Sequence, residues 1–126
     1  MIEIWKDIEG YEGLYQVSNL GNVKSLNYNH TGLEKKLKPQ KNNKGYLRIE
    51  LCKNGKRKKF SIHELVADTF IENPNNLPCV NHKDENKINN NVENLEHCTY
   101  SYNNTYGNRI KKFLETKKKI NKATKK

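Results

Sequence analysis

The sequence has few apolar residues and no long run of them. Hydrophobic residues make up 33% of its 126 residues, and the mean hydropathy is -1.07. No stretch approaches the roughly 20 apolar residues that a membrane-spanning helix needs. The first residues also lack the basic segment and apolar segment of a secretory signal. The composition therefore excludes a large core and predicts a cytoplasmic protein of one domain, with at most a small appendage.

Cysteine is scarce as well. The chain has Cys52, Cys79 and Cys98, at wide spacing and without a CxxC pair. An odd number of distant cysteines argues against a disulfide framework, and three cannot form a four-cysteine zinc site. A mixed zinc site could use His97 together with Cys79 and Cys98. Because neighbouring residues of a strand point to opposite faces, this alternative is disfavoured.

Acidic residues are outnumbered by basic ones. The chain contains 24 Lys and Arg residues against 14 Asp and Glu residues, a formal net charge of +10. This balance predicts a polyanionic partner, with nucleic acid first and an anionic membrane surface second. Two clusters contain many of the basic residues, and they are the predicted nucleic-acid contacts: Lys53, Lys56, Arg57, Lys58, Lys59, Arg109, Lys111 and Lys112.

Short strands and tight turns are predicted for the first half of the chain. Four segments have the pattern of strands, at residues 14–17, 22–26, 46–51 and 57–62. Turn residues join each pair, Ser18 to Gly21 in the first and Asn54–Gly55 in the second, so we expect two hairpins. The polar segment between the hairpins, residues 27–45, predicts a loop with one possible edge strand near residues 36–39.

A helix and a strand–loop–strand–helix unit are predicted for the second half. Apolar residues recur at helical spacing from Ile62 to Phe70, with Ser61 and Glu64 placed as a capping box and Asn73–Pro74 as a stop signal. Strands are then expected at residues 79–82 and 94–98, followed by a helix capped by Thr99. This last unit has little apolar surface to bury, so we expect it to need a metal or a bound partner.

The same unit contains the groups that phosphodiester hydrolysis requires. The reaction needs a base that deprotonates water and a hard cation that stabilises the developing charge. His82 has an ordinary pKa near 6.5, which suits a base at neutral pH. Asn81 and Asn103 offer carbonyl oxygens, which suit Mg²⁺ or Mn²⁺, one divalent cation per active site. Two neutral amides bind such an ion weakly, so phosphate oxygens of the substrate would have to complete its shell.

Two separate parts of the chain resemble one nuclease family. Residues 63–74 (HELVADTFIENP), 80–90 (VNHKDENKINN) and 92–96 (VENLE) resemble the HNH homing endonucleases of phages and group I introns. Residues 3–26 resemble the small nuclease-associated module, NUMOD4-like, that often precedes that domain. The resemblance implies an α+β fold in which a small N-terminal β-hairpin module precedes an HNH ββα-metal nuclease unit.

The resemblance also implies domain boundaries. The chain divides into a nuclease-associated module (1–26), a basic linker with a β-hairpin (27–60), the nuclease domain (61–108) and a basic tail (109–126). The tail is either a solvated end or an arm that contacts phosphates.

The resemblance assigns roles residue by residue. His82 takes the position of the general base, Asn81 and Asn103 those of the metal ligands, and Asn94 that of the residue that braces the loop between the strands. The family often has Asp where this chain has Asn81. Asp84 could supply the missing charge, although Asp after a strand is more often a turn residue. For His63, a packing role is favoured over a catalytic one.

The sequence therefore predicts a metal-dependent endonuclease of double-stranded DNA. With one active site per chain, a monomer should nick one strand, and the resemblance implies a 5′ phosphate and a 3′ hydroxyl as products. We expect a monomer or weak dimer in the cytoplasm of a phage-infected or bacterial cell. Two alternatives stay open: a catalytically inactive DNA-binding protein of the same fold, and a basic RNA-binding protein.

Overall fold

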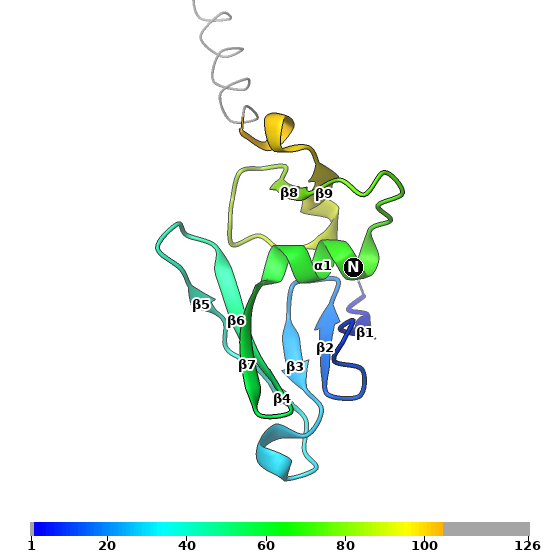
Figure 1. Cartoon of the computed structure of the whole chain (residues 1–126), viewed down its shortest axis with the longest axis vertical. Coiled ribbons are helices and arrows are strands. Elements are labelled where there is room, and N and C mark those ends of the chain that lie inside the picture. Colours follow the sequence, from blue (N-terminus) through cyan, green and yellow to red (C-terminus); the bar gives the residue numbers. More distant parts are fainter. Residues whose placement is uncertain (1, 105–126) are drawn as a thin grey trace, which may run out of the picture.

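The computed structural model describes residues 2–104 and has an α+β architecture of three small antiparallel sheets around one helix. The sheets have strand orders β1-β2-β3-β4, β5-β6-β7 and β8-β9. The helix, α1, crosses the ends of the longer strands and separates them from the β8–β9 unit (Figure 1). The elements are β1 (Trp5–Asp7), β2 (Tyr15–Ser18), β3 (Val23–Ser25), a 3₁₀ turn η1 (Tyr28–His30), β4 (Lys35–Lys36), β5 (Gln40–Lys41), β6 (Leu47–Lys53), β7 (Lys56–Ser61), α1 (Ile62–Phe70), β8 (Cys79–His82), η2 (Val92–Asn94) and β9 (Leu95–Cys98), followed by helical residues 100–104.

The first sheet contains the predicted hairpin of β2 and β3. Val17 pairs with Val23, and both side chains are buried. The strand β1, which the sequence did not predict, joins the edge because Trp5 pairs with Ser18 and because the Asn19 side chain accepts a hydrogen bond of 2.7 Å from the Ile4 amide. The prediction of a two-stranded module is therefore extended to four strands.

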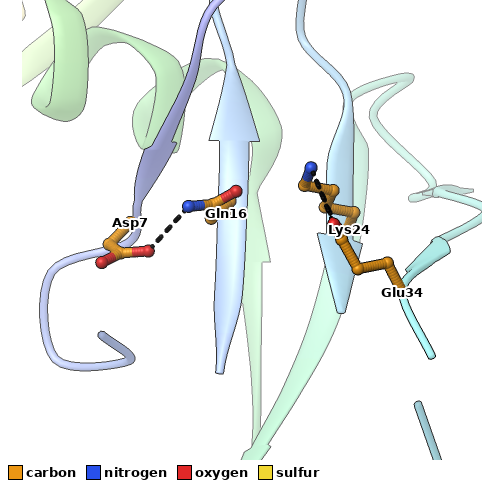
Figure 2. Close-up of polar contacts among 4 residues, drawn as sticks. All are labelled: Asp7, Gln16, Lys24 and Glu34. Carbon is orange, nitrogen blue, oxygen red and sulfur yellow. Dashed lines mark hydrogen bonds and ion pairs between the residues drawn. The ribbon is translucent and has the colours of Figure 1, made fainter. Parts of the chain in front are cut away.

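Polar side chains tie the edges of this sheet together (Figure 2). Gln16 Nε2 donates to Asp7 Oδ1 at 3.0 Å, between β2 and β1. Lys24 Nζ lies 3.2 Å from Glu34 Oε2, between β3 and the segment before β4. The first contact is exposed and the second partly so, and such contacts add little stability but help to fix which strands are neighbours.

The second predicted hairpin is confirmed. β6 and β7 pair from Arg48↔Ser61 to Lys53↔Lys56 around Asn54 and Gly55. These two turn residues have φ values of 52° and 75°, the left-handed conformation that a tight hairpin turn requires.

The expected edge strand near residues 36–39 is found as β4, at the edge of the first sheet, and a second short strand, β5, follows it. Two strands of two residues each, β4 and β5, lie on either side of Leu37–Pro39 and belong to different sheets. Pro39 has no amide hydrogen to donate, so it interrupts the ladder at this point.

Helix α1 supplies the centre of the core. Ile62, Leu65 and Val66 are buried against apolar residues of the first two sheets, and the whole cluster is Ile8, Val17, Val23, Ile49, Leu51, Ile62, Leu65, Val66 and Leu95. This small cluster agrees with the low apolar content of the chain. Within residues 2–104, no helix is long and apolar enough to cross a membrane.

The predicted capping box at the start of α1 is not formed. Ser61 occupies the N-cap position, but its side chain makes no capping hydrogen bond. Ser61 is also the last residue of β7, paired with Arg48, so the strand ladder fixes its backbone. The helix ends at Phe70, earlier than the stop signal at Asn73–Pro74.

The β8–β9 unit has the predicted strand–loop–strand form. β8 has the expected bounds, whereas Asn94 belongs to η2 and β9 begins at Leu95. The disfavoured zinc site is not formed, because Nε2 of His97 lies 3.1 Å from the carbonyl oxygens of Ala67 and Ile71 and the ring thus faces α1. In the part of the chain that the structure describes, no three His, Cys, Asp or Glu side chains group as a metal site.

Candidate active site

His82, the last residue of β8, lies in a group of three rings. Its centroid is 4.8 Å from that of His63 and 5.9 Å from that of Tyr46, and the Tyr46 and His63 rings stack at 5.0 Å. Tyr46 immediately precedes β6, and His63 lies in the first turn of α1. Three elements therefore converge on His82, whose exposed fraction is only 5%.

A hydrogen bond fixes the protonation of the His82 ring. Nε2 of His82 lies 2.8 Å from Oδ1 of Asn90, which is itself buried. An amide oxygen can only accept a hydrogen bond, so the imidazole proton resides on Nε2. The other nitrogen, Nδ1, then carries the lone pair that can take a proton.

Burial keeps both histidines neutral near pH 7. It lowers the pKa of His82 below its usual value, and the hydrogen bond to Asn90 offsets this only in part. For His63, burial and the neighbouring His82 lower the pKa to about 4. The carboxylate of Glu64 lies 4.0 Å from Nε2 of His63, but it is exposed and therefore too well screened to hold a proton on that ring.

The structure brings Asn81, His82 and Asn103 together. All three line a polar pocket of about 180 Å³, with Tyr46, Val80, Glu85 and Lys87. Asn81 comes from β8, and Asn103 comes from the helical residues that follow Thr99, whose carbonyl oxygen accepts from the Asn103 amide at 3.0 Å. Residues from the two ends of the predicted unit therefore share one site.

The pocket has the donor chemistry of a hard divalent cation. Nδ2 of Asn81 donates to Glu96 Oε1 at 3.0 Å, so the amide oxygen is the atom that Asn81 retains for a cation. Asn103 adds a second amide oxygen and Glu85 a carboxylate. Oxygen donors of this kind fit Mg²⁺ or Mn²⁺, and their small number leaves positions for water molecules or a substrate phosphate.

Asn94 braces the loop from outside the pocket. Its Nδ2 donates to Asp84 Oδ1 at 2.8 Å and to the Asn89 carbonyl oxygen at 2.9 Å, and its Oδ1 accepts from the Asp84 amide at 3.1 Å. Asp84 also accepts from Asn86 and Asn89, and these hydrogen bonds lower the pKa of its carboxyl group. Both residues thus organise the loop.

The predicted nucleic-acid contacts fall into two groups. Lys53, Lys56, Arg57, Lys58 and Lys59 are exposed along the β6–β7 hairpin, whose turn lies at the opposite end of the molecule from β8–β9 (Figure 1). The remaining three, Arg109, Lys111 and Lys112, lie outside the described residues. The hairpin is therefore remote from the pocket, and a duplex would have to reach across the molecule to contact both.

A second basic region was missed by the sequence reasoning. A pocket of about 360 Å³ is lined by Lys35, Lys36, Lys38, Arg48 and Lys59, together with Glu50 and apolar residues. Its lysines lie on or beside β4, within the segment that the sequence suggested to be a loop. A cluster of lysines such as Lys35, Lys36 and Lys38 in a polar segment is too common in this chain to have identified the region.

Comparison with known proteins shows which proteins this chain is similar to. The DNA endonuclease I-HmuI of Bacillus phage SP01 is 48% identical over 99 residues, which are 79% of this chain and 54% of that protein. A solved structure described as DNA binding and cleavage by the HNH homing endonuclease I-HmuI superposes with a TM-score of 0.73 at 42% identity, over 94% of this chain and 66% of that one. The chain is a homologue of the HNH homing endonucleases.

Two further relatives named as HNH endonucleases, and one sequence motif, agree with this similarity. An uncharacterized HNH endonuclease of Acanthamoeba polyphaga mimivirus is 55% identical over 69 residues, 55% of this chain and 21% of that protein. Another from the same virus is 43% identical over 106 residues, 80% of this chain and 25% of that protein. The NUMOD4 motif matches residues 3–52. The chain spans between about a fifth and two thirds of the length of these HNH relatives.

Proposed function

We propose that this HNH homologue is a metal-dependent endonuclease that hydrolyses phosphodiester bonds and cuts one strand of double-stranded DNA. The observation that carries the proposal is the shared pocket of Asn81, His82 and Asn103, in which a neutral imidazole lies beside two amide oxygen donors. The DNA binding and cleavage described for the I-HmuI structure support the choice of substrate.

His82 is the general base of the proposed reaction. Its Nδ1 accepts a proton from a water molecule, whose oxygen forms a bond to phosphorus while the bond from phosphorus to the 3′ oxygen breaks. The departing 3′ oxygen takes up a proton, so the products are a 5′ phosphate and a 3′ hydroxyl. The imidazolium then returns its proton to solvent, which leaves the site ready for another cycle.

Asn81 and Asn103 are the residues that would hold the cation. A bound Mg²⁺ or Mn²⁺ ion would supply positive charge to the phosphate and to the leaving oxygen. Asn81 keeps its oxygen available because its amide nitrogen is the atom that donates to Glu96. Asn94 hydrogen-bonds to the loop that follows His82 and holds that loop in place, so its proposed role is a positioning one.

The basic surfaces are the proposed contacts with the DNA backbone. Lysines predominate in the hairpin group and in the pocket beside β4, and lysine binds phosphate as a point charge and reads bases poorly. Binding is therefore expected to be salt-sensitive. Replacing Lys59 with Ala should reduce the slope of log affinity against log salt by about 1, whereas Lys6→Ala on β1 should leave it unchanged.

Conversion of supercoiled plasmid to the open-circular form tests the proposal. Wild type should nick in Mg²⁺ or Mn²⁺ and should stop doing so with EDTA, and His82→Ala should lower the rate by about 10²-fold or more while DNA binding persists. The matched control is His30→Asn, because His30 is exposed in η1 and asparagine tolerates its φ of 59°. A monomer with one site should give open circles before any linear product.

Three outcomes would overturn parts of the proposal. Equal nicking by wild type and His82→Ala would remove His82 from the chemistry. Binding of duplex DNA without cutting, across both metals, would favour an inactive DNA-binding protein of the same fold. A clear preference for structured RNA over duplex DNA would favour the RNA-binding alternative. We also propose that the protein acts inside a phage-infected or bacterial cell, which its phage relative supports.

A further inference from the structure

The β2–β3 turn abuts the end of the loop that carries Asn90. Gly21 in this turn has φ +89°, and a Cβ atom there would lie 2.8 Å from Cβ of Asn90 and 3.0 Å from its carbonyl oxygen. Two residues further along, the Val92 amide donates to the Asn19 carbonyl oxygen at 2.8 Å. The turn and the loop are therefore in direct contact at adjacent points, and that contact has no room for a side chain at Gly21.

Asn90 connects this contact to His82. Its backbone meets Gly21, while its side-chain oxygen lies 2.8 Å from Nε2 of His82. Asn90 is only 4% exposed, so its side chain cannot swing into solvent without disturbing the packing. A displacement of the loop at Gly21 would therefore move the acceptor on which the His82 ring depends.

The rings around His82 confine it but do not choose its tautomer. Tyr46 and His63 lie face to face with each other and tilted against His82, which restricts where the imidazole plane can lie. Ring contacts of this kind do not distinguish Nδ1–H from Nε2–H, whereas a hydrogen-bond acceptor on one nitrogen does. The position of Asn90 is thus the feature that decides which nitrogen is free to take a proton.

We propose that the β2–β3 turn, which belongs to the NUMOD4 segment, is a positioning element for the nuclease site: Gly21 seats Asn90, and Asn90 holds the His82 proton on Nε2. The inference rests on the proposed function of His82 as a base that works through Nδ1. It gives the N-terminal segment a role in the chemistry, in addition to any contact it makes with DNA.

The tautomer of His82 can be measured without metal or DNA. In the full chain at pH 8, long-range ¹⁵N–¹H NMR should show the Nε2–H form for wild type. Asn90→Ala should give a mixture of both tautomers, and Asn90→Asp, which keeps an oxygen acceptor, should restore the Nε2–H form. Gly21→Ala should shift the population in the direction of Asn90→Ala, because the added Cβ displaces Asn90.

Gly13→Ala is the matched control for Gly21→Ala. Gly13 has a similar φ of +77°, but a Cβ atom there meets nothing within 4 Å, so this variant has the backbone strain without the contact. The nicking rate should fall about 10- to 100-fold in Gly21→Ala and Asn90→Ala, as is typical when the partner of a site residue is removed, and should change less than twofold in Gly13→Ala.

Each result decides the inference independently of nicking. An unchanged Nε2–H form in Asn90→Ala, or equal tautomer shifts in Gly21→Ala and Gly13→Ala, would overturn it. If Gly21→Ala does not fold, the Asn90→Ala and Asn90→Asp pair still tests the hydrogen bond. If no protein nicks DNA, wild type included, the proposed nuclease function fails, and the tautomer measurement still shows whether the turn sets His82.

Discussion

The strand scaffold and the β8–β9 unit are stabilised by different interactions. The scaffold of β1 to β7 and α1 buries almost the whole apolar cluster, to which the β8–β9 unit adds Leu95. The unit instead buries polar groups, with Asn81, His82 and Asn90 all at most 6% exposed. Apolar burial tolerates small shifts, whereas buried polar groups need their partners in place. The unit therefore depends on the scaffold to hold the partners of its buried polar groups in place.

The largest effect is expected from a core truncation in the scaffold. Leu51→Ala removes a fully buried side chain of β6 and should lower the free energy of unfolding by about 2–5 kcal/mol in urea titrations. Leu33→Ala is the control, because Leu33 is 68% exposed and its truncation should cost less than about 0.5 kcal/mol. Equal costs at the two positions would contradict the division between core and surface.

The next effect concerns stability in acid. It arises at His63 of α1, whose ring contacts that of His82 in the β8–β9 unit. In the unfolded chain, His63 takes up a proton once the pH falls below its ordinary pKa of 6.5. In the folded chain its pKa is about 4, so it takes up a proton only near pH 4. As pH falls from 6.5 to 4, the unfolded state binds more protons, so stability decreases, by up to about 3 kcal/mol from this residue. Nδ1 of His63 is buried without a hydrogen-bond partner, which adds to the cost of a charge there.

His63→Phe should remove most of this acid sensitivity. Phenylalanine can keep the ring contact with Tyr46 and cannot be protonated, so unfolding free energies at pH 7 and pH 5 should differ less than in wild type. Some slope should persist, because burial also lowers the pKa of His82. An unchanged slope in the variant would show that His63 titrates normally in the folded protein.

A smaller and more local effect is expected at Asn94. Asn94→Ala removes the three side-chain hydrogen bonds that hold the loop after β8 and should cost about 1–3 kcal/mol. Asn94→Asp should be no better, since its carboxylate would face that of Asp84 in place of the present 2.8 Å hydrogen bond. Hydrogen exchange should accelerate in residues 83–90 of both variants and stay slow in β6, and uniform acceleration would contradict a local brace.

The smallest effect should come from the exposed ion pair on the hairpin. Arg57 Nη1 lies 3.7 Å from Glu50 Oε1, and both side chains are largely solvated. A double-mutant cycle with Glu50→Ala and Arg57→Ala should give a coupling energy below about 1 kcal/mol. A value of about 2 kcal/mol or more would mean that this exposed pair contributes as much as a core side chain.

Local signals account for what the sequence predicts correctly. The Asn54–Gly55 turn, the α1 periodicity and the bounds of β8 depend on neighbouring residues, and these predictions are confirmed. β1 and β5 are not recoverable in this way, because strands of two or three residues are too short to show a periodic pattern and form only against a partner strand. The two-stranded first module and the capping box failed for the same reason, since longer-range pairing overrides local preference.

The same distinction between local signals and long-range contacts applies to the candidate site. The juxtaposition of Asn81 and His82 can be read directly from the chain, and their roles stay predictions until nicking is measured. The contributions of Asn90 and Tyr46 could not be inferred, because each reaches His82 only through the assembled fold. Gly21 has a sequence signal, but a glycine after Asn19–Leu20 indicates only a turn and says nothing of the loop pressed against it.

The β6–β7 hairpin has a consequence for how such proteins can be recombined. The NUMOD4 match ends at residue 52, inside β6, whereas the partner strand β7 begins at Lys56. A crossover at the motif boundary would give the five paired residues of β6 from Arg48 to Cys52 a foreign partner strand, and it would also separate Gly21 from its own Asn90. A junction after β7 would keep the hairpin whole, but only a junction beyond Asn90 would also keep Gly21 with the residue it abuts.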